Sequence, residues 1–303
     1  MFNSTVLDTA IALIFIYTIF SLLASTIKEW IAGWLHWRGV MLKRGVGCMI
    51  AAAPNSFIIR TDSTGAPLSV QRGDKLNVDV FFKTPGINSQ SDKDRLPSYI
   101  APDQFANAYL ALAFPGNDGT TLTLNRLRQA LEIAEVSVAA DLRTFISLVT
   151  LPSSNLNLGV QNWFNANMDR VSGWYKRKTQ FVLVLISIVL VAGLNIDTIR
   201  ITKEISKNST MRNAIVAAAT KTGSDSTKFF KSNIHDIDST VSTLGIPLGW
   251  NRCYCNAEDI ISLIFGLMLT AAALSLGAPF WFDLLNKFTN LRYSGPKPDE
   301  NKK

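Results

Sequence analysis

The chain has 303 residues, of which 48% are hydrophobic, and a formal net charge of +7. Its apolar residues are concentrated in three long blocks and are not spread evenly with helix or strand periodicity, which favours a membrane protein over an ordinary soluble one. The excess cations lie beside these blocks, so they do not indicate a nucleic-acid-binding surface.

The first block, "TAIALIFIYTIFSLLASTI" at 9–27, carries no charge. At about 1.5 Å per residue, a helix of this length crosses most of a hydrocarbon core of about 30 Å. Residues 1–27 are therefore predicted to form a first transmembrane helix. A cleaved signal peptide is the alternative, but no cation precedes the block. Its apolar run also exceeds the short apolar core that is typical of a signal peptide.

Tryptophans follow this block at helical spacing. Trp30, Trp34 and Trp37 recur together with Ile27 and Met41 at steps of three and four, which predicts one face of a helix that continues from the first span. Indole rings suit the lipid headgroup layer, because an apolar ring and a polar N–H are both satisfied there. Packing on the next domain is the alternative interpretation.

Residues 28–178 are predicted to form a mostly helical domain between the first two spans. Apolar residues at 57–59 and the alternation over 76–82 suggest a small β-hairpin. A polar segment at 86–95 is predicted to be an exposed linker. A helix should then begin at Pro102 and stop before Pro115.

Two more helical stripes follow in this domain. The first stripe includes Leu124, Leu127, Leu131, Ala134 and Val138. The next is a short helix that should end before residue 152. The chain then feeds without a helix breaker into the second span, which predicts one long helix over 158–196.

The second block carries no charge from Thr179 to Ile196. A strand of a soluble sheet is typically only about 5 or 6 residues long, so the block is too long for one. Residues 179–196 are therefore predicted to form the second transmembrane helix. A buried helix of a soluble protein is the alternative.

Residues 197–259 are predicted to form a small domain of helix and loop on the far side of the membrane. Ser209 can cap a helix that Gly223 closes. The apolar run at 243–250 is too short to span, so it should lie against the membrane face or this helix. Trp250 would then sit at the interface.

The third block, at 260–282, is predicted to form the third transmembrane helix, followed by a tail at 283–303. A narrow stripe of small residues runs along this block and favours close helix packing. Oligomerisation or a partner helix would explain the stripe, and so would packing against the first two spans. Its members are Gly266, Thr270, Ala273 and Gly277.

Cations predict the orientation, because lysine and arginine near the ends of spans are retained in the cytoplasm. They follow the first and third spans, and Lys176, Arg177 and Lys178 stand directly before the second. The N-terminus is therefore expected outside, 28–178 and the C-terminus in the cytoplasm, and 197–259 outside. Trp174 and Trp281 would mark the cytoplasmic interface of the second and third spans.

Two motifs carry a resemblance to a family. They are "DRVSGWYKRKTQ" within 162–201 and "LGAPFWFDLLNK" within 275–295. With residues 95–112, these segments resemble a family of bacterial inner-membrane proteins that have three transmembrane helices and no assigned function. The resemblance implies a multi-pass inner-membrane protein with a helical cytoplasmic insert. It brings no catalytic or binding residue, and the chain departs from the family pattern around 48–90.

Motifs of catalytic chemistry are missing from the sequence. It has no GxxxxGK[ST] loop, no HExxH zinc motif and no GxSxG elbow. His36 and His235 are predicted on opposite sides of the membrane. Cys253 and Cys255 are predicted outside, where oxidation is possible, but two cysteines without a nearby histidine make a poor metal site. No enzyme activity, cofactor or metal is therefore expected.

The expected fold class is a mainly α integral membrane protein. We favour a non-enzymatic anchor or scaffold that contacts the lipid bilayer and either protein partners or further copies of itself, with no nucleic acid. An oligomeric pore, including a membrane effector, is the alternative. An unrecognised membrane enzyme is a third hypothesis.

Overall fold

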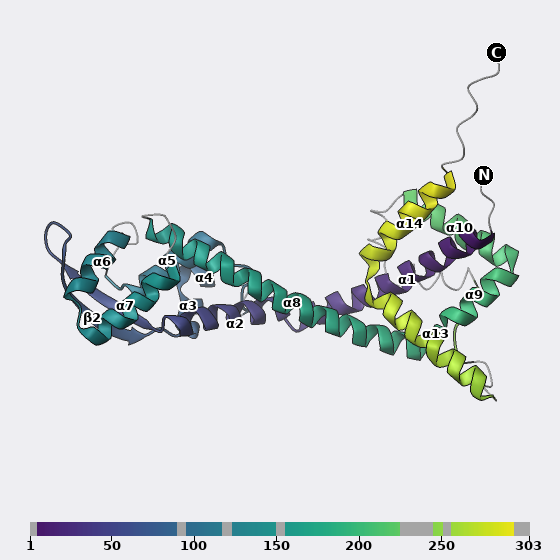
Figure 1. The fold of residues 1–303 in the computed structure, drawn as a ribbon, viewed down its shortest axis with the longest axis horizontal. Coiled ribbons are helices and arrows are strands. Elements are labelled where there is room, and N and C mark those ends of the chain that lie inside the picture. The colour runs from purple at the N-terminus through teal and green to yellow at the C-terminus, as the bar shows by residue number, and fades with distance from the viewer. Residues whose placement is uncertain are drawn as a thin grey trace, which may run out of the picture. The chain divides into compact units, whose positions relative to one another are not determined.

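A computed structural model describes residues 5–89, 95–116, 123–149, 155–224, 245–250 and 256–293. The described part of the chain is mostly helical and contains one two-stranded sheet, so the mainly α class is confirmed (Figure 1). The chain divides into two compact units. Residues 32–177 form one of them, and 1–31 with 178–303 form the other.

The unit of residues 32–177 is built from short helices around a hairpin. The hairpin strands are β1 (Asn55–Thr61) and β2 (Pro67–Lys75). The helices are α2 (Trp37–Ala52), α3 (Val78–Lys83), α4 (Pro85–Asn88), α5 (Pro102–Ala113), α6 (Leu124–Ile133), α7 (Val136–Val149) and the first part of α8 (Leu156–Leu194).

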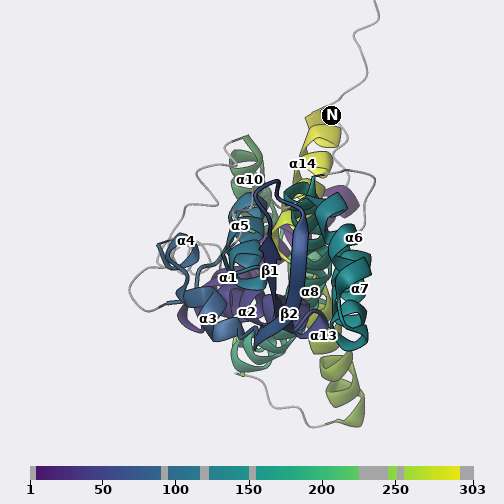
Figure 2. The ribbon, with the colours of Figure 1, turned by 90° about the vertical axis from the view of Figure 1, so that its left-hand side faces the viewer.

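The β-hairpin is antiparallel, and Figure 2 shows its strands side by side, with α6 and α7 next to β2. Asp62 shapes the turn, because its Oδ1 accepts the N–H groups of Thr64 and Ala66, each at 2.8 Å. The Thr64 hydroxyl donates to the same oxygen, and this bond is the main reason that the pKa of the Asp62 carboxyl lies below its usual value. Gly65 supplies the positive φ of 82° that the turn requires.

The hairpin was predicted from residues 57–59, but the second strand was placed wrongly. Residues 78–82 of the alternation over 76–82 belong to α3, whose first turn is capped by the Asn77 side chain through the N–H of Asp79. Lys43 of α2 pairs with Asp79 at 2.6 Å and holds the pKa of that carboxyl below its usual value. A local cap and a tertiary ion pair therefore favour helix over the period-2 pattern.

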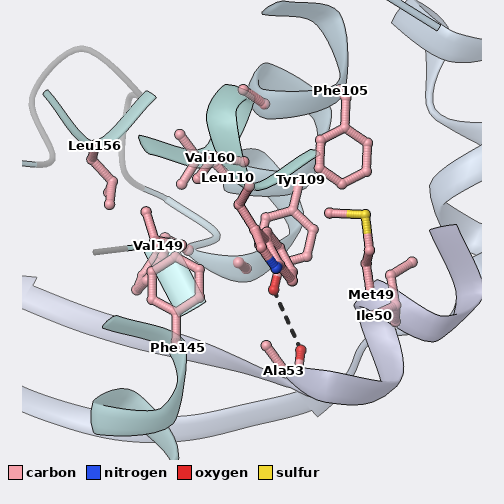
Figure 3. Packing of buried hydrophobic residues seen from close by; sticks show 14 of the residues in the cluster. Met49, Ile50, Ala53, Phe105, Tyr109, Leu110, Phe145, Val149, Leu156 and Val160 are labelled. Carbon is pink, nitrogen blue, oxygen red and sulfur yellow. Dashed lines mark hydrogen bonds between the residues drawn. The ribbon is translucent and has the colours of Figure 1, made fainter. Parts of the chain in front are cut away.

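Aromatic rings fill the core of this unit (Figure 3). Phe105 of α5 stacks on Phe164 of α8 with ring centroids 4.4 Å apart. Tyr109 is fully buried between Phe145 and Trp163, and its hydroxyl donates to the carbonyl of Ala53 at 3.4 Å. Burial raises the pKa of the Tyr109 phenol. The apolar stripes predicted for α5, α7 and α8 thus meet in one core.

Helix boundaries in this unit agree with the sequence in part. The helix from Pro102 ends at Ala113, as predicted, and the long helix predicted over 158–196 is α8, which runs from Leu156 to Leu194. The stripe that includes Leu124 and Val138 is not one helix. Ala134 adopts an extended conformation, so α6 ends before it and Val138 belongs to α7.

The second unit contains all or part of each described helix that could cross a membrane. Its elements are α1 (Thr5–Trp34), the end of α8, α9 (Thr198–Lys207), α10 (Ser209–Ser224), α13 (Ala257–Ser275) and α14 (Ala278–Tyr293). By length and composition, α1, α8 and α13 are long and apolar enough to span a bilayer.

These three helices differ in how far protein covers them. In its most apolar stretch, α1 is 67% buried, whereas the corresponding values are 22% for α8 and 28% for α13. The α1 helix therefore lies in the core of the second unit. The apolar faces of α8 and α13 are open, as expected of helices that contact lipid.

The third apolar block is broken into two helices. The α13 helix ends at Ser275 instead of continuing to residue 282. Gly277, with a φ of 84°, redirects the chain into α14, because glycine adopts this backbone conformation without strain. The length of α13 is 19 residues. A helix of that length still matches the thickness of a hydrocarbon core.

The helix predicted over 209–223 is present as α10, although Asn208 and not Ser209 caps it, by accepting the N–H of Met211 at 3.1 Å. This helix packs against α14. This contact buries Ile215 and Ala219 of α10 in the same core as Leu285 of α14. The cation pattern expects α10 outside and the chain after α13 in the cytoplasm. The packing of the second unit brings these two segments together.

Candidate functional site

An apolar cavity of about 350 Å³ opens in the unit of residues 32–177. It lies between the first turns of α2, the segment 98–102 and the middle of α8. Its apolar lining comes from Met41, Leu42, Ile100, Phe164, Met168 and Val171. Its polar lining comes from Arg38, Ser98, Tyr99, Asn165, Ser172 and Tyr175.

Two glycines let α2 approach the other walls of this cavity. A Cβ atom at Gly45 would overlap the side chain of Val171 on α8, so only glycine permits this approach. A Cβ atom at Gly39 would lie 2.9 Å from the carbonyl oxygen of Leu96, just before the 98–102 segment. The sequence shows both glycines, but their partners lie far along the chain.

Cation and aromatic contacts tie α2 to α8 beside the cavity. The Arg38 guanidinium lies 5.8 Å from the centroid of the Tyr175 ring, and its Nε donates to the Tyr175 hydroxyl at 3.4 Å. Further along α2, the Arg44 guanidinium lies 5.9 Å from the centroid of Trp174. Both distances are within the range of cation–π attraction. Trp174, predicted at the interface, is thus a partner of Arg44.

The three cations that were predicted to set the topology come directly after Tyr175 in α8. Lys176 and Arg177 are exposed, and Lys178 is half-buried. The uncharged stretch of α8 begins at the next residue, Thr179. The cavity therefore ends within a turn or two of the segment that could enter a bilayer.

The predicted row of three tryptophans is interrupted. His36, with a φ of 49°, lies in a break between α1 and α2. Trp30 and Trp34 on α1 are 73% and 72% exposed, whereas Trp37 on α2 is buried. A single continuous helix face over these residues is therefore wrong, and only the first two indoles are exposed enough to contact lipid headgroups.

The other two tryptophans also differ from one another. Trp281 is buried, with its ring centroid 4.6 Å from that of Tyr17 and its Nε1 donating to the Ala273 carbonyl at 2.6 Å. Trp281, which was predicted at the membrane interface, thus packs within the second unit. Trp250 is about half exposed, and its Nε1 donates to the carbonyl of Ala192 at 3.1 Å. The 245–250 segment thus packs on the end of α8.

The small-residue stripe of α13 packs against the same chain. Gly266, Thr270 and Ala273 are buried, whereas Gly277 lies beyond the helix. A Cβ atom at Gly266 would overlap the carboxylate of Asp197, which caps the start of α9. The stripe was expected to contact a partner or the first two spans. The start of α9 lies against Gly266 and Thr270, and a Cβ atom at Gly277 would lie 3.7 Å from Leu183 of the second span.

Hydroxyl groups join three helices at this contact. The Thr198 hydroxyl lies 2.7 Å from that of Thr270 and 2.8 Å from that of Tyr17 on α1. Thr270 also accepts the N–H of Thr198 at 3.2 Å. All three side chains are buried. The bonds among them therefore satisfy hydroxyl groups that have little access to water.

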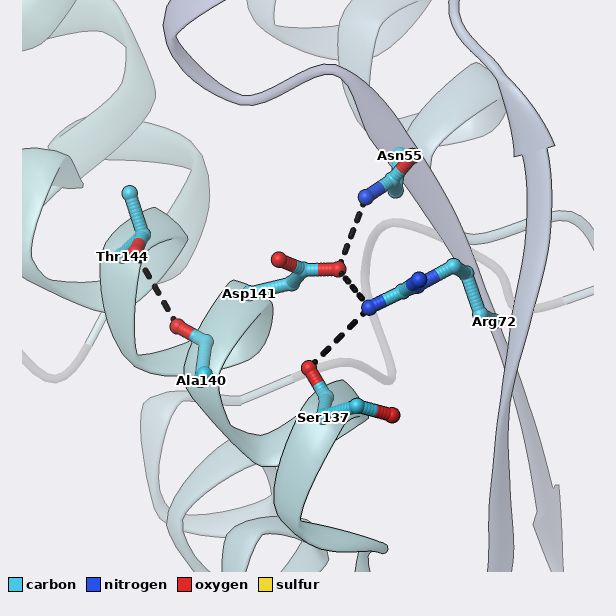
Figure 4. Close-up of polar contacts among 6 residues, drawn as sticks. All are labelled: Asn55, Arg72, Ser137, Ala140, Asp141 and Thr144. Atoms are coloured by element: carbon cyan, nitrogen blue, oxygen red, sulfur yellow. Dashed lines mark hydrogen bonds and ion pairs between the residues drawn. The ribbon is translucent and has the colours of Figure 1, made fainter.

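A second polar cluster holds the hairpin to α7 (Figure 4). The Asp141 carboxylate accepts the side-chain amide of Asn55 at 2.7 Å and pairs with the Arg72 guanidinium at 2.6 Å. Arg72 also donates to the carbonyl of Ser137 at 3.1 Å. The cluster joins both strands to one helix, which is a structural role.

No described part of the chain places three or more histidine, cysteine or acidic side chains where they could hold a metal ion. Cys48 is an exposed free thiol. His235, Cys253 and Cys255 lie outside the described residues.

No protein-family model, curated protein or solved structure matches the chain.

Proposed function

We propose that the protein is a non-enzymatic membrane anchor that presents residues 28–178 as a helical module to protein partners or to further copies of itself. The observation that carries this proposal is the continuity of α8. Val160 and Phe164 at its start are buried in the aromatic core, and its second half is the uncharged stretch that could span a bilayer. A module built on a membrane-spanning helix is anchored without a flexible linker.

The proposed location is the bacterial inner membrane, with the N-terminus outside and the module in the cytoplasm. The cation cluster at 176–178 and the cations that follow α1 support this orientation, because such residues are retained on the cytoplasmic side. The choice of the bacterial inner membrane rests on the motifs at 169–180 and 276–287, which resemble those of a family of bacterial inner-membrane proteins. The cations after α13 favour a cytoplasmic C-terminus.

The exposed apolar tip between α6 and α7 is the part of the module best suited to a protein partner. Val136 is 89% exposed and Ile133 is 48% exposed, although both are apolar. An isolated exposed valine is common, but two such residues flanking a helix break form a small patch that a partner could cover.

Native pull-down from detergent extracts tests the proposal. We expect a stoichiometric partner, or the protein itself, to be captured by the wild type and lost with Val136→Glu. Thr144→Glu is the matched control, because Thr144 is exposed on the same helix α7. Equal capture by both variants would exclude this surface. Ion flux from the purified protein in liposomes would instead favour a pore.

A further inference from the structure

We propose that the cavity between α2 and α8 binds one acyl chain of an anionic phospholipid, with the phosphate held at Arg38. This inference rests on the proposed function in one respect, because it requires the module to lie at the membrane surface. It names a lipid as a ligand of the module, in addition to any protein partner.

The position of the cavity along α8 favours a lipid. Tyr175 lies about one helical turn before Thr179, where the uncharged stretch begins. Phe164, at the other end of the cavity, lies about three further turns from that stretch. The cavity therefore runs along α8 away from the segment that would enter the bilayer. A lipid headgroup at that level would meet Arg38 and Tyr175 first.

The charge of the site suits an anionic headgroup. Arginine binds phosphate through several N–H donors in a fixed geometry. The hydroxyls of Ser98, Ser172 and Tyr175 also border the cavity, and none of the described side chains that line it is acidic. Arg44 and the cations at 176–178 lie on the same two helices and raise the local positive potential. An anionic lipid would thus be favoured over a zwitterionic one.

The apolar part of the lining suits a hydrocarbon chain. Met41 and Met168 line the cavity together with Phe164 and Val171, and methionine adapts its shape to irregular apolar ligands. The cavity volume is about 350 Å³. This volume is at the small end of the range for ligand cavities. The cavity therefore holds part of one chain, while the rest of the lipid stays in the bilayer.

Lipid retention on the full-length protein tests this site. The protein is reconstituted in nanodiscs of phosphatidylcholine mixed with phosphatidylglycerol, extracted into detergent and examined by native mass spectrometry. The wild type should retain phosphatidylglycerol in preference to phosphatidylcholine. Arg38→Gln should reduce this retention about ten-fold, the size of one charge-assisted hydrogen bond. Arg128→Gln, at an exposed position on α6, is the control for charge and should retain the lipid.

A second pair of variants tests the cavity itself. Asn165→Trp should block it and lower lipid retention without changing the charge. Asn162→Trp, at an exposed position on the same helix that does not line the cavity, should have no effect. Equal retention by Arg38→Gln, Asn165→Trp and their controls would overturn the proposal. A second result would also overturn the proposal. In it, Arg38→Gln and Asn165→Trp lose a protein that co-purifies with the wild type and the controls, while their lipid retention is unchanged.

The same preparations separate this inference from the anchor proposal. Partner capture depends on Val136, at the α6–α7 tip, which does not line the cavity. A wild-type protein that shows no preference for phosphatidylglycerol but captures its partner normally would therefore remove only the lipid site. Normal lipid specificity without any partner would remove only the proposed anchor function.

Discussion

Gly266 determines how closely α13 can approach the start of α9. The Asp197 carboxylate occupies the position that a Cβ atom at Gly266 would take, and this carboxylate also accepts the N–H of Ile199 at the cap of α9. A side chain at Gly266 must therefore displace both the helix and its cap. Thr270, one turn along α13, would lose its short contact with Thr198 in the same movement.

We expect Gly266→Ala to destabilise the second unit by about 1–3 kcal/mol, the usual cost of overpacking a closed contact. Denaturant unfolding in mixed micelles would measure this change. Gly193→Ala is the matched control, because a Cβ atom at Gly193 on α8 meets no other atom within 4 Å. Equal stability of the two variants would show that α13 does not pack on α9 in the protein extracted from membranes.

At the scale of elements, the hairpin depends on α7 for its position. The two strands alone form only a small sheet, and an isolated hairpin is marginally stable in water. Asp141 binds one side chain from each strand, Asn55 and Arg72. Losing the Asp141 charge would therefore loosen both strands together.

We expect Asp141→Asn to lower the free energy of unfolding of the module by about 1 kcal/mol. The loss is modest because the Arg72 and Asp141 side chains are 45% and 31% exposed and keep access to water. Hydrogen exchange of the β1 and β2 amides should rise more than that of α5. Asp169→Asn, at an exposed position on α8, should leave both measurements unchanged.

The sequence predicted the elements whose signals are local and long. An uncharged stretch that continues an amphipathic run predicted α8 almost to its ends, and Pro102 placed the start of α5. The sequence misplaced β2, because "PLSVQRGDK" is polar along most of its length and lies at a sheet edge. It also missed the break at His36, where a residue other than glycine adopts a positive φ that tertiary packing must impose.

The candidate site was less predictable than the fold. Arg38, Tyr175 and Met168 each have an ordinary local context, and the cavity exists only because Gly45 brings α2 against α8. The stripe on α13 was visible as a contact surface, but its contact with the start of α9 was not. Asp197 was predicted only as the first residue after the second span, and with Thr198 it forms a buried neighbour of that stripe.

At the scale of the whole molecule, the topology predicted from the cations conflicts with the helix packing in the second unit. The cations predict α10 outside and α14 in the cytoplasm, yet these helices pack together. Both conditions are met if α10 enters the bilayer from the outside. The helix has 16 residues, and residues 213–220 carry no charge. Its Arg212 donates to the carbonyls of Ile205 and Ser206 at the end of α9.

We therefore expect Ala217, which other parts of the protein leave exposed, to face lipid. In a background with Cys48, Cys253 and Cys255 replaced by serine, Ala217→Cys should react with a lipid-soluble maleimide but resist a membrane-impermeant one in both intact cells and inverted vesicles. Lys203→Cys, at an exposed position on α9, should react with the impermeant reagent in intact cells. If Ala217→Cys reacts from outside as fast as Lys203→Cys, α10 lies in water. Its packing on α14 would then place the C-terminal helix outside as well, against the cations that follow α13.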